Sequence, residues 1–139
     1  MIAYDADPSH TVLSASYHQQ KLFATYRGTQ TLPVTNTAGE INPMFWVATL
    51  DEPSNILYLK VVNTLNASVP LSVDFDCEWR GVNGTILTAD DLNSYNFIYN
   101  QTEVVPAEIG FEEGEVRAEE GGFEWVVPRW SINVLEFQL

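Results

Sequence analysis

The apolar residues of this chain of 139 residues change their spacing once, and that change constrains the fold more than any other feature. Over residues 14–26 they recur every three or four positions, which predicts one amphipathic helix. Ser14 or Ser16 would cap its start, and Gly28 would end it in a left-handed conformation. After Gly28 the spacing becomes two, which predicts strands. We therefore expect a mainly β fold that follows a single helix.

Eight segments after Gly28 are predicted to be strands. They are residues 31–35, 44–50, 56–64, 69–76, 84–88, 104–111, 123–127 and 131–138. In the third of these Lys60 falls on the face opposite to Leu59, and the alternation of the fourth places Cys77 on a buried face. Many short strands joined by turns predict an antiparallel β-sandwich of jelly-roll type. The helix would pack on one end of that sandwich or belong to a preceding domain.

Charge and length exclude several classes of function. Six basic and nineteen acidic side chains give a net charge of −13, and such a surface repels nucleic acid and anionic membranes. No apolar run approaches the roughly 18 residues that a membrane span needs, and the first residues lack a signal-peptide pattern. A complete (β/α)8 barrel of about 250 residues exceeds this length. Neutral or cationic partners, including sugars, remain possible.

The sequence carries no pattern for a metal ion, a cofactor or a nucleophile. His10 and His18 are eight residues apart, whereas metal ligands on one helix usually lie three or four apart. Cys77 is the only cysteine, and both histidines lie far from it in the first segment. We therefore expect no cofactor and no metal site, and we expect Cys77 to be a buried or half-buried structural residue.

Glycoside hydrolysis needs two carboxyl groups that converge in a shielded cleft. The chain has four adjacent acidic pairs, all in turns or polar stretches, and neighbours on a strand point to opposite faces. The pairs are Asp51 with Glu52, Asp90 with Asp91, Glu112 with Glu113, and Glu119 with Glu120. We interpret them as a solvated acidic surface and predict no catalytic residue in this chain.

Aromatic side chains are the candidates for sugar contact, because a flat ring can stack on the C–H face of a sugar. Trp46 and Trp125 lie inside predicted strands and are expected in the core, whereas Trp79 lies at a strand exit and is expected to be exposed. Three further rings alternate within residues 93–100 and would share one side of an extended loop, covering a sandwich edge or contacting sugar. The candidate substrate-contact residues are Trp79, Tyr95, Phe97 and Tyr99.

Three glycosylation sequons begin at Asn66, Asn83 and Asn100, all in turn-like segments that could accommodate a glycan. They predict that the parent protein is extracellular, with its export signal outside this chain.

Several blocks of sequence carry a family resemblance in a fixed order. They are residues 11–23, 27–28, 32–34, 43–48, 57–63, 69–73 and 85–89, then Asn96, residues 104–106 and residues 123–136. In this order they resemble the C-terminal end of the α-L-arabinofuranosidases of glycoside hydrolase family 51. The resemblance covers residues 9–138, and the first block resembles the last helix of the family's catalytic barrel.

The resemblance implies that catalysis takes place in one domain of the parent enzyme and that this chain supplies another domain. The family joins a (β/α)8 catalytic barrel to a β-sandwich and releases terminal non-reducing α-L-arabinofuranosyl residues from arabinoxylan and arabinan, with retention. Both catalytic glutamates lie on barrel strands upstream of the matched segment, so none is assigned here. Residues 1–28 would be the end of the barrel and residues 29–139 the sandwich. The partners would be that barrel and, through the parent enzyme, an arabinose-containing polysaccharide.

Two departures from the family pattern affect the expected activity. The chain begins inside the last barrel helix, which suggests a fragment or truncated form, and residues 112–120 are unusually acidic. Activity of the isolated chain is therefore not expected. The alternative interpretations are a free-standing carbohydrate-binding sandwich and a protein-interaction sandwich without catalysis.

Overall fold

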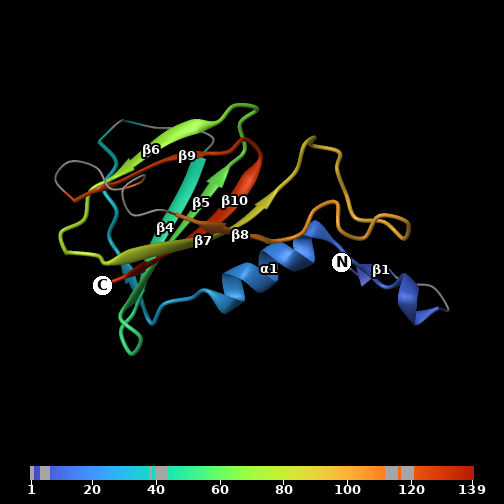
Figure 1. The fold of residues 1–139 in the computed structure, drawn as a ribbon, viewed down its shortest axis with the longest axis horizontal. Coiled ribbons are helices and arrows are strands. Elements are labelled where there is room, and N and C mark those ends of the chain that lie inside the picture. Colours follow the sequence, from blue (N-terminus) through green and yellow to red (C-terminus); the bar gives the residue numbers. More distant parts are fainter. Residues whose placement is uncertain (1, 4–6, 38, 40–43, 112–115, 117–120) are drawn as a thin grey trace.

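The computed structural model describes residues 2–3, 7–37, 39, 44–111, 116 and 121–139. An antiparallel six-stranded sheet forms the middle layer, with a two-stranded sheet on one face and the helix on the other (Figure 1). The predicted mainly β, antiparallel sandwich with one α-helix is thereby confirmed for the described residues.

The middle sheet places the last strand of the chain at its centre. In spatial order the strands are β3 (Gln30–Leu32), β4 (Met44–Asp51), β5 (Ile56–Asn63), β10 (Ser131–Gln138), β7 (Gly81–Thr88) and β8 (Ala107–Gly110). Leu135 of β10 lies opposite Leu59 of β5 on one side and Gly84 of β7 on the other. The C-terminal strand thus joins strands from distant parts of the sequence.

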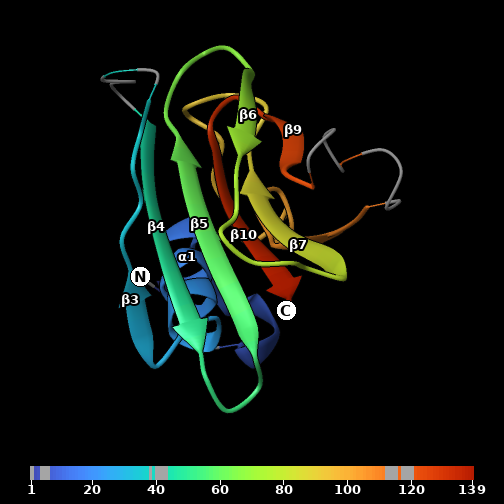
Figure 2. The same ribbon diagram turned by 90° about the vertical axis from the view of Figure 1, so that its left-hand side faces the viewer.

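The second sheet consists of β6 (Val69–Val73) and β9 (Phe123–Val127), and Figure 2 shows it over one part of the middle sheet. The core between the two sheets is strongly aromatic. Phe137 has no exposed surface, and its ring lies 5.1 Å from that of Phe123 and 5.6 Å from that of Trp79. Edge-to-face and tilted contacts of this kind stabilise a core beyond simple area burial.

The helix α1 (Ala15–Thr25) covers the other face of the middle sheet. The Ser14 side chain accepts a hydrogen bond from the backbone N–H of Tyr17, which confirms the predicted cap. Leu22 of the helix packs with Leu87 and Val134 of the sheet in a second apolar cluster. The helix therefore lies across a face of the sandwich rather than at its end.

All eight predicted strands are present, with bounds that differ by a few residues. The expectation for Cys77 was wrong, since this thiol is exposed. Strand β6 ends at Val73, and the alternation of its buried side chains reaches only Phe75. The alternation of apolar and polar residues in the sequence therefore continues past the end of β6, and Cys77 lies beyond the part of it that is buried.

The prediction for Gly28 was also wrong in its mechanism. Gly28 is not among the residues with positive φ. Its backbone instead passes so close to β4 that an added Cβ would lie 2.5 Å from the Leu50 carbonyl oxygen. Glycine is needed at this position for close approach and not for a left-handed turn.

The segment before the helix has structure that the sequence did not predict. Two short strands, β1 (Ile2–Ala3) and β2 (Val12–Leu13), pair with each other, and a 3-10 turn η1 (Pro8–His10) lies between them. The Asp7 carboxylate caps this turn by accepting from the hydroxyl and the backbone N–H of Ser9. The hydroxyl contributes most to the resulting lowering of the Asp7 pKa. Elements of two or three residues are too short to show a repeating pattern of apolar residues, so the sequence does not predict them.

Candidate functional site

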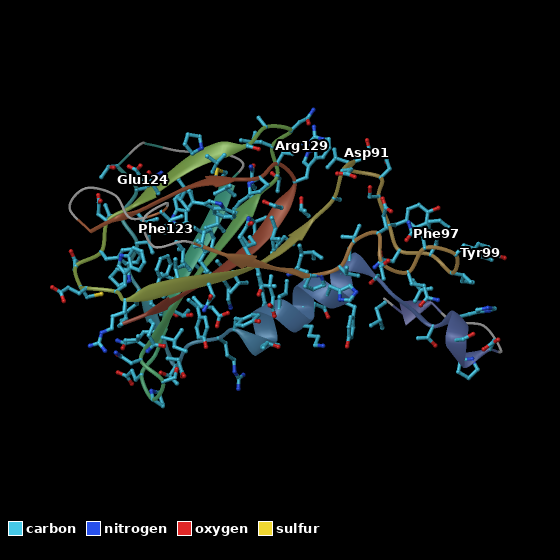
Figure 3. The ribbon with its side chains drawn as sticks, in the orientation of Figure 1. Asp91, Phe97, Tyr99, Phe123, Glu124 and Arg129 are labelled. Carbon is cyan, nitrogen blue, oxygen red and sulfur yellow. The ribbon has the colours of Figure 1, made fainter. Side chains whose placement is uncertain are left out.

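The most prominent feature outside the two sheets is the aromatic arm, which we define as residues 89–106 between β7 and β8. It extends from the sandwich at the end where the segment before α1 also lies (Figure 1). In Figure 3, Asp91 lies near the sandwich end of the arm, and Phe97 and Tyr99 lie toward its far end. The arm is therefore a projecting surface that could meet a ligand or another domain.

Asn96 anchors the arm. Its side-chain N–H₂ donates to the carbonyl oxygens of Leu13 and Val104, each at 2.8 Å, and its oxygen accepts from the Val104 N–H at 2.7 Å. A second link joins the Gln101 amide to the Ser9 carbonyl at 3.0 Å. Because Asn96 is only 9% exposed, this clamp is shielded from competing water.

Three aromatic rings of the arm face solvent. Tyr95, Phe97 and Tyr99 are 66%, 41% and 92% exposed, and the first two rings lie 5.6 Å apart. Asn96 between them points inward, as expected from the alternation in the sequence. The arrangement can offer flat apolar faces with two phenol hydroxyls to a partner.

Trp79 does not join these rings, and its predicted exposure was wrong. Its side chain is 2% exposed, is surrounded by core rings and donates its indole N–H to the Gly121 carbonyl at 2.8 Å. Trp46 and Trp125 pack against the same core cluster, as predicted. Trp79 is therefore a structural residue whose face no sugar can reach.

The described acidic pairs do not form a catalytic site. Asp51 is the last residue of β4 and Glu52 begins the turn after it, whereas Asp90 and Asp91 lie at the base of the arm, where the Asp91 carboxylate accepts from Asn93. The pairs at 112–113 and 119–120 lie outside the described residues.

Glu136 is a half-buried carboxyl on the helix side of β10. Burial raises its pKa above the ordinary value. It lines a hollow of about 380 Å³ together with Ile56, Asn83 and Gln138, and it is the one carboxyl group among the described residues that line this hollow. One carboxyl alone cannot supply both the acid and the nucleophile of a retaining reaction.

Lys60 connects the sheet to the helix, a role that sequence reasoning missed. Its ammonium is buried, donates to the Phe23 carbonyl at 3.2 Å and lies 5.0 Å from the centre of the Phe23 ring. Burial lowers its pKa. The carbonyl belongs to the last turn of α1, where the helix dipole favours a positive charge. The sequence does contain a signal for this role, because Lys60 is the one charged residue of the largely apolar strand β5.

Beside Lys60 the same face of the sheet is left uncovered. Phe45 and Val47 of β4 are 57% and 38% exposed, and Phe45 lies opposite the half-buried Val62 of β5. We call these three residues the β4 patch. Exposed apolar residues grouped next to a docked helix are typical of a surface that meets another structure.

The three sequons differ in accessibility. Asn66 is exposed in the turn between β5 and β6, as predicted. Asn83 is also exposed, but its predicted place in a turn was wrong, because β7 already begins at Gly81. Asn100 is half-buried, and its side-chain amide donates to Glu103 at 2.7 Å. Within the described part of the chain no helix has both the length and the apolar character to cross a membrane.

The fold first defines the class of this protein: a β-sandwich with an attached helix and, among the described residues, no converging carboxyl pair. The family model of the α-L-arabinofuranosidase C-terminal domain matches residues 1–131, and the chain belongs to that family.

Relatives and solved structures agree with this assignment. A probable α-L-arabinofuranosidase A of Aspergillus niger is 30% identical over 135 residues, which make up 97% of this chain and 20% of that relative. An α-L-arabinofuranosidase A of Aspergillus kawachii gives the same identity and coverage. The chain thus spans about a fifth of the length of these relatives.

Two enzymes of glycoside hydrolase family 51 share the fold. An arabinose-bound α-L-arabinofuranosidase superposes with a TM-score of 0.77 at 22% identity, covering 99% of this chain and 21% of that one. The arabinofuranosidase of Xanthomonas axonopodis pv. citri gives 0.75 at 23% identity, covering 99% and 28%. In both, the matching region is a minor part of a longer enzyme.

Proposed function

We propose that this chain is the non-catalytic sandwich of a retaining α-L-arabinofuranosidase and that it fixes the last helix of the catalytic barrel. The parent enzyme releases terminal non-reducing α-L-arabinofuranosyl residues from arabinoxylan or arabinan. The observation that carries the proposal is the attachment of α1 to the sheet by Lys60 and the Leu22 cluster. Retention needs two carboxyl groups about 5 Å apart, which the barrel supplies.

In this proposal residues 1–28 belong to the barrel and residues 29–139 form the sandwich. The helix α1 has one face on the sheet, while Lys21, Ala24 and Thr25 remain exposed. That exposed side is available to the neighbouring helices and strands of the barrel. The β4 patch lies on the same side of the sheet as α1 and extends the contact surface.

Complementation tests this function. The barrel half of the parent enzyme is expressed without residues 29–139, and the purified sandwich is added. We expect restored hydrolysis of p-nitrophenyl α-L-arabinofuranoside. Phe45→Asp in the sandwich should prevent the restoration, whereas Val126→Asp, on an exposed side chain of β9, should not. Failure of the wild-type sandwich to restore activity would contradict the proposal.

A second candidate is a free-standing carbohydrate-binding sandwich, which the exposed rings of the arm favour. Affinity electrophoresis of the chain in arabinoxylan gels tests it. Retarded migration that is lost in Tyr95→Ala would support it, and unretarded migration would count against it.

We further propose that the parent enzyme is extracellular and acts on hemicellulose. Asn66 and Asn83 are then the accessible acceptors for N-linked glycans, whereas Asn100 is engaged with Glu103. Peptide mass spectrometry of the protein secreted from a fungal host should find glycan on Asn66. Unmodified Asn66 in secreted protein would contradict this.

A further inference from the structure

The direction of α1 determines where the arm lies in the parent enzyme. In a (β/α)8 barrel each strand leads through a loop into the following helix, and these loops form the catalytic face. The segment 7–14 leads directly into α1. If α1 is the last barrel helix, as proposed above, then this segment is the final loop of the catalytic face.

The arm is hydrogen-bonded to that segment, just before the start of α1. Asn96 donates to the Leu13 carbonyl at 2.8 Å, and Gln101 donates to the Ser9 carbonyl at 3.0 Å. Figure 1 shows the arm beside the start of α1, away from the turn between β4 and β5. The arm therefore lies at the rim of the catalytic face, although the sandwich itself lies beside the barrel.

The chemistry of the arm suits a neutral polymer. Tyr95, Phe97 and Tyr99 present exposed rings on the arm, Tyr99 from the turn between Phe97 and Asn100, and two of the rings carry hydroxyls that can bond to sugar hydroxyls. Residues 89–106 contain three carboxylates, Asp90, Asp91 and Glu103, and no lysine or arginine. A second copy of a chain with net charge −13 would be repelled by this surface, whereas an uncharged polysaccharide would not.

We propose that the arm is an accessory platform for the polysaccharide substrate, on which Tyr95, Phe97 and Tyr99 stack against backbone sugars beyond the arabinofuranosyl residue being removed. This inference rests on the proposed function. The rings hold a long substrate at the rim of the active site and do not touch the reacting bond. Small glycosides do not extend to the arm and gain nothing from it.

The test compares a polymer with a small substrate in the whole enzyme that carries this chain. In the double variant Tyr95→Ala with Tyr99→Ala, we expect the KM for arabinoxylan to rise about five- to tenfold, as for the loss of one or two exposed stacking contacts. The kinetics on p-nitrophenyl α-L-arabinofuranoside and the melting temperature should not change. Tyr99→Phe, which keeps the ring face, should retain most of the polymer affinity.

Leu92→Ala is the matched control, because Leu92 is an exposed apolar residue of the same arm without a ring. This variant should leave the kinetics on both substrates unchanged. Unchanged arabinoxylan kinetics in the double variant would overturn the platform. An equal loss on both substrates, or a lowered melting temperature, would also overturn it, because the rings would then pack on the barrel.

The assay separates this inference from the proposed function. A wild-type enzyme without turnover of the small glycoside would refute the proposed function. Wild-type turnover together with an unaffected double variant would refute only the platform.

Discussion

At the scale of single residues, the ammonium group of Lys60 explains how a strand in the middle of the sheet holds a helix. It is buried between β5 and α1 and donates to a carbonyl that the end of a helix leaves without an intrahelical partner. Its ammonium nitrogen also lies 5.0 Å from the centre of the Phe23 ring, a distance typical of a cation–π contact. One side chain therefore combines a hydrogen bond, a favourable contact with the helix dipole and a cation–π contact.

Lys60→Ala should lower the free energy of unfolding by about 1–3 kcal/mol, because the partly buried Phe23 carbonyl loses its donor. Lys60→Met keeps most of the apolar stem and should lose less. Urea unfolding of the two variants and the wild type measures the difference. A Lys60→Ala variant as stable as the wild type would show that the contact contributes nothing.

Glu136 gives a pH-dependent prediction. Burial raises its pKa above 4.5 in the folded protein, so the folded state binds its proton more tightly than the unfolded state. The stability associated with this proton is complete below the unfolded pKa and is lost as the pH rises through the folded pKa. Glu136→Gln should therefore be more stable than the wild type at about pH 7, and this advantage should vanish at about pH 3.5. Melting temperatures at the two pH values test this, and a constant difference would contradict it.

At the scale of elements, the aromatic arm depends on the Asn96 clamp. Asn96→Ala leaves the Val104 N–H and two carbonyls without their partner, which should destabilise the arm by about 1–3 kcal/mol. Hydrogen exchange should become faster in residues 89–106 and stay unchanged in β5 and β10. Asn93→Ala, at an exposed asparagine of the same arm, is the control and should have little effect. Unchanged exchange in the Asn96 variant would contradict the clamp.

The close approach of Gly28 to β4 gives a second prediction at this scale. Gly28→Ala would place a methyl group against the Leu50 backbone and should destabilise the fold by about 1–3 kcal/mol. Gly81→Ala is the matched control, since a Cβ there would meet nothing within 4 Å. Thermal unfolding should separate the two variants, and equal melting temperatures would contradict the steric account.

The regular elements could be predicted from the sequence because each has a local signal. The alternation of apolar and polar residues predicted the strands. The capping residue Ser14 and the spacing of apolar residues over 14–26 predicted α1. Alternation also located the exposed Tyr95 and the inward-pointing Asn96 beside it. Tyr99 is exposed for a different reason, because it lies in the turn between Phe97 and Asn100.

Features that depend on contacts between distant residues could not be predicted in this way. Asn96 meets Leu13, and Lys60 meets Phe23, only because the sheet brings separate parts of the chain together. Trp79 was expected to be exposed just after a strand, but the rings of Phe123 and Phe137 pack against it in the core. Burial of an irregular segment is decided by its tertiary neighbours, for which a single sequence carries no periodic signal.

At the scale of the whole molecule, the described residues form a layered sandwich with two distinct ends. The middle sheet buries one face against β6 and β9 and the other against α1. The arm and the segment before α1 lie together at one end, and the Glu136 hollow lies near the opposite end of β7. This arrangement suits a domain that holds and extends a catalytic barrel, and it offers no converging carboxyl pair among the described residues.

The central claim is that this chain supports glycoside hydrolysis without performing it. The most direct measurement is the hydrolysis of p-nitrophenyl α-L-arabinofuranoside by the purified chain, with the whole parent enzyme as the positive control. The account predicts turnover by the whole enzyme and none above background by the chain. Turnover by the chain that persists through repeated purification and follows its concentration would contradict the account.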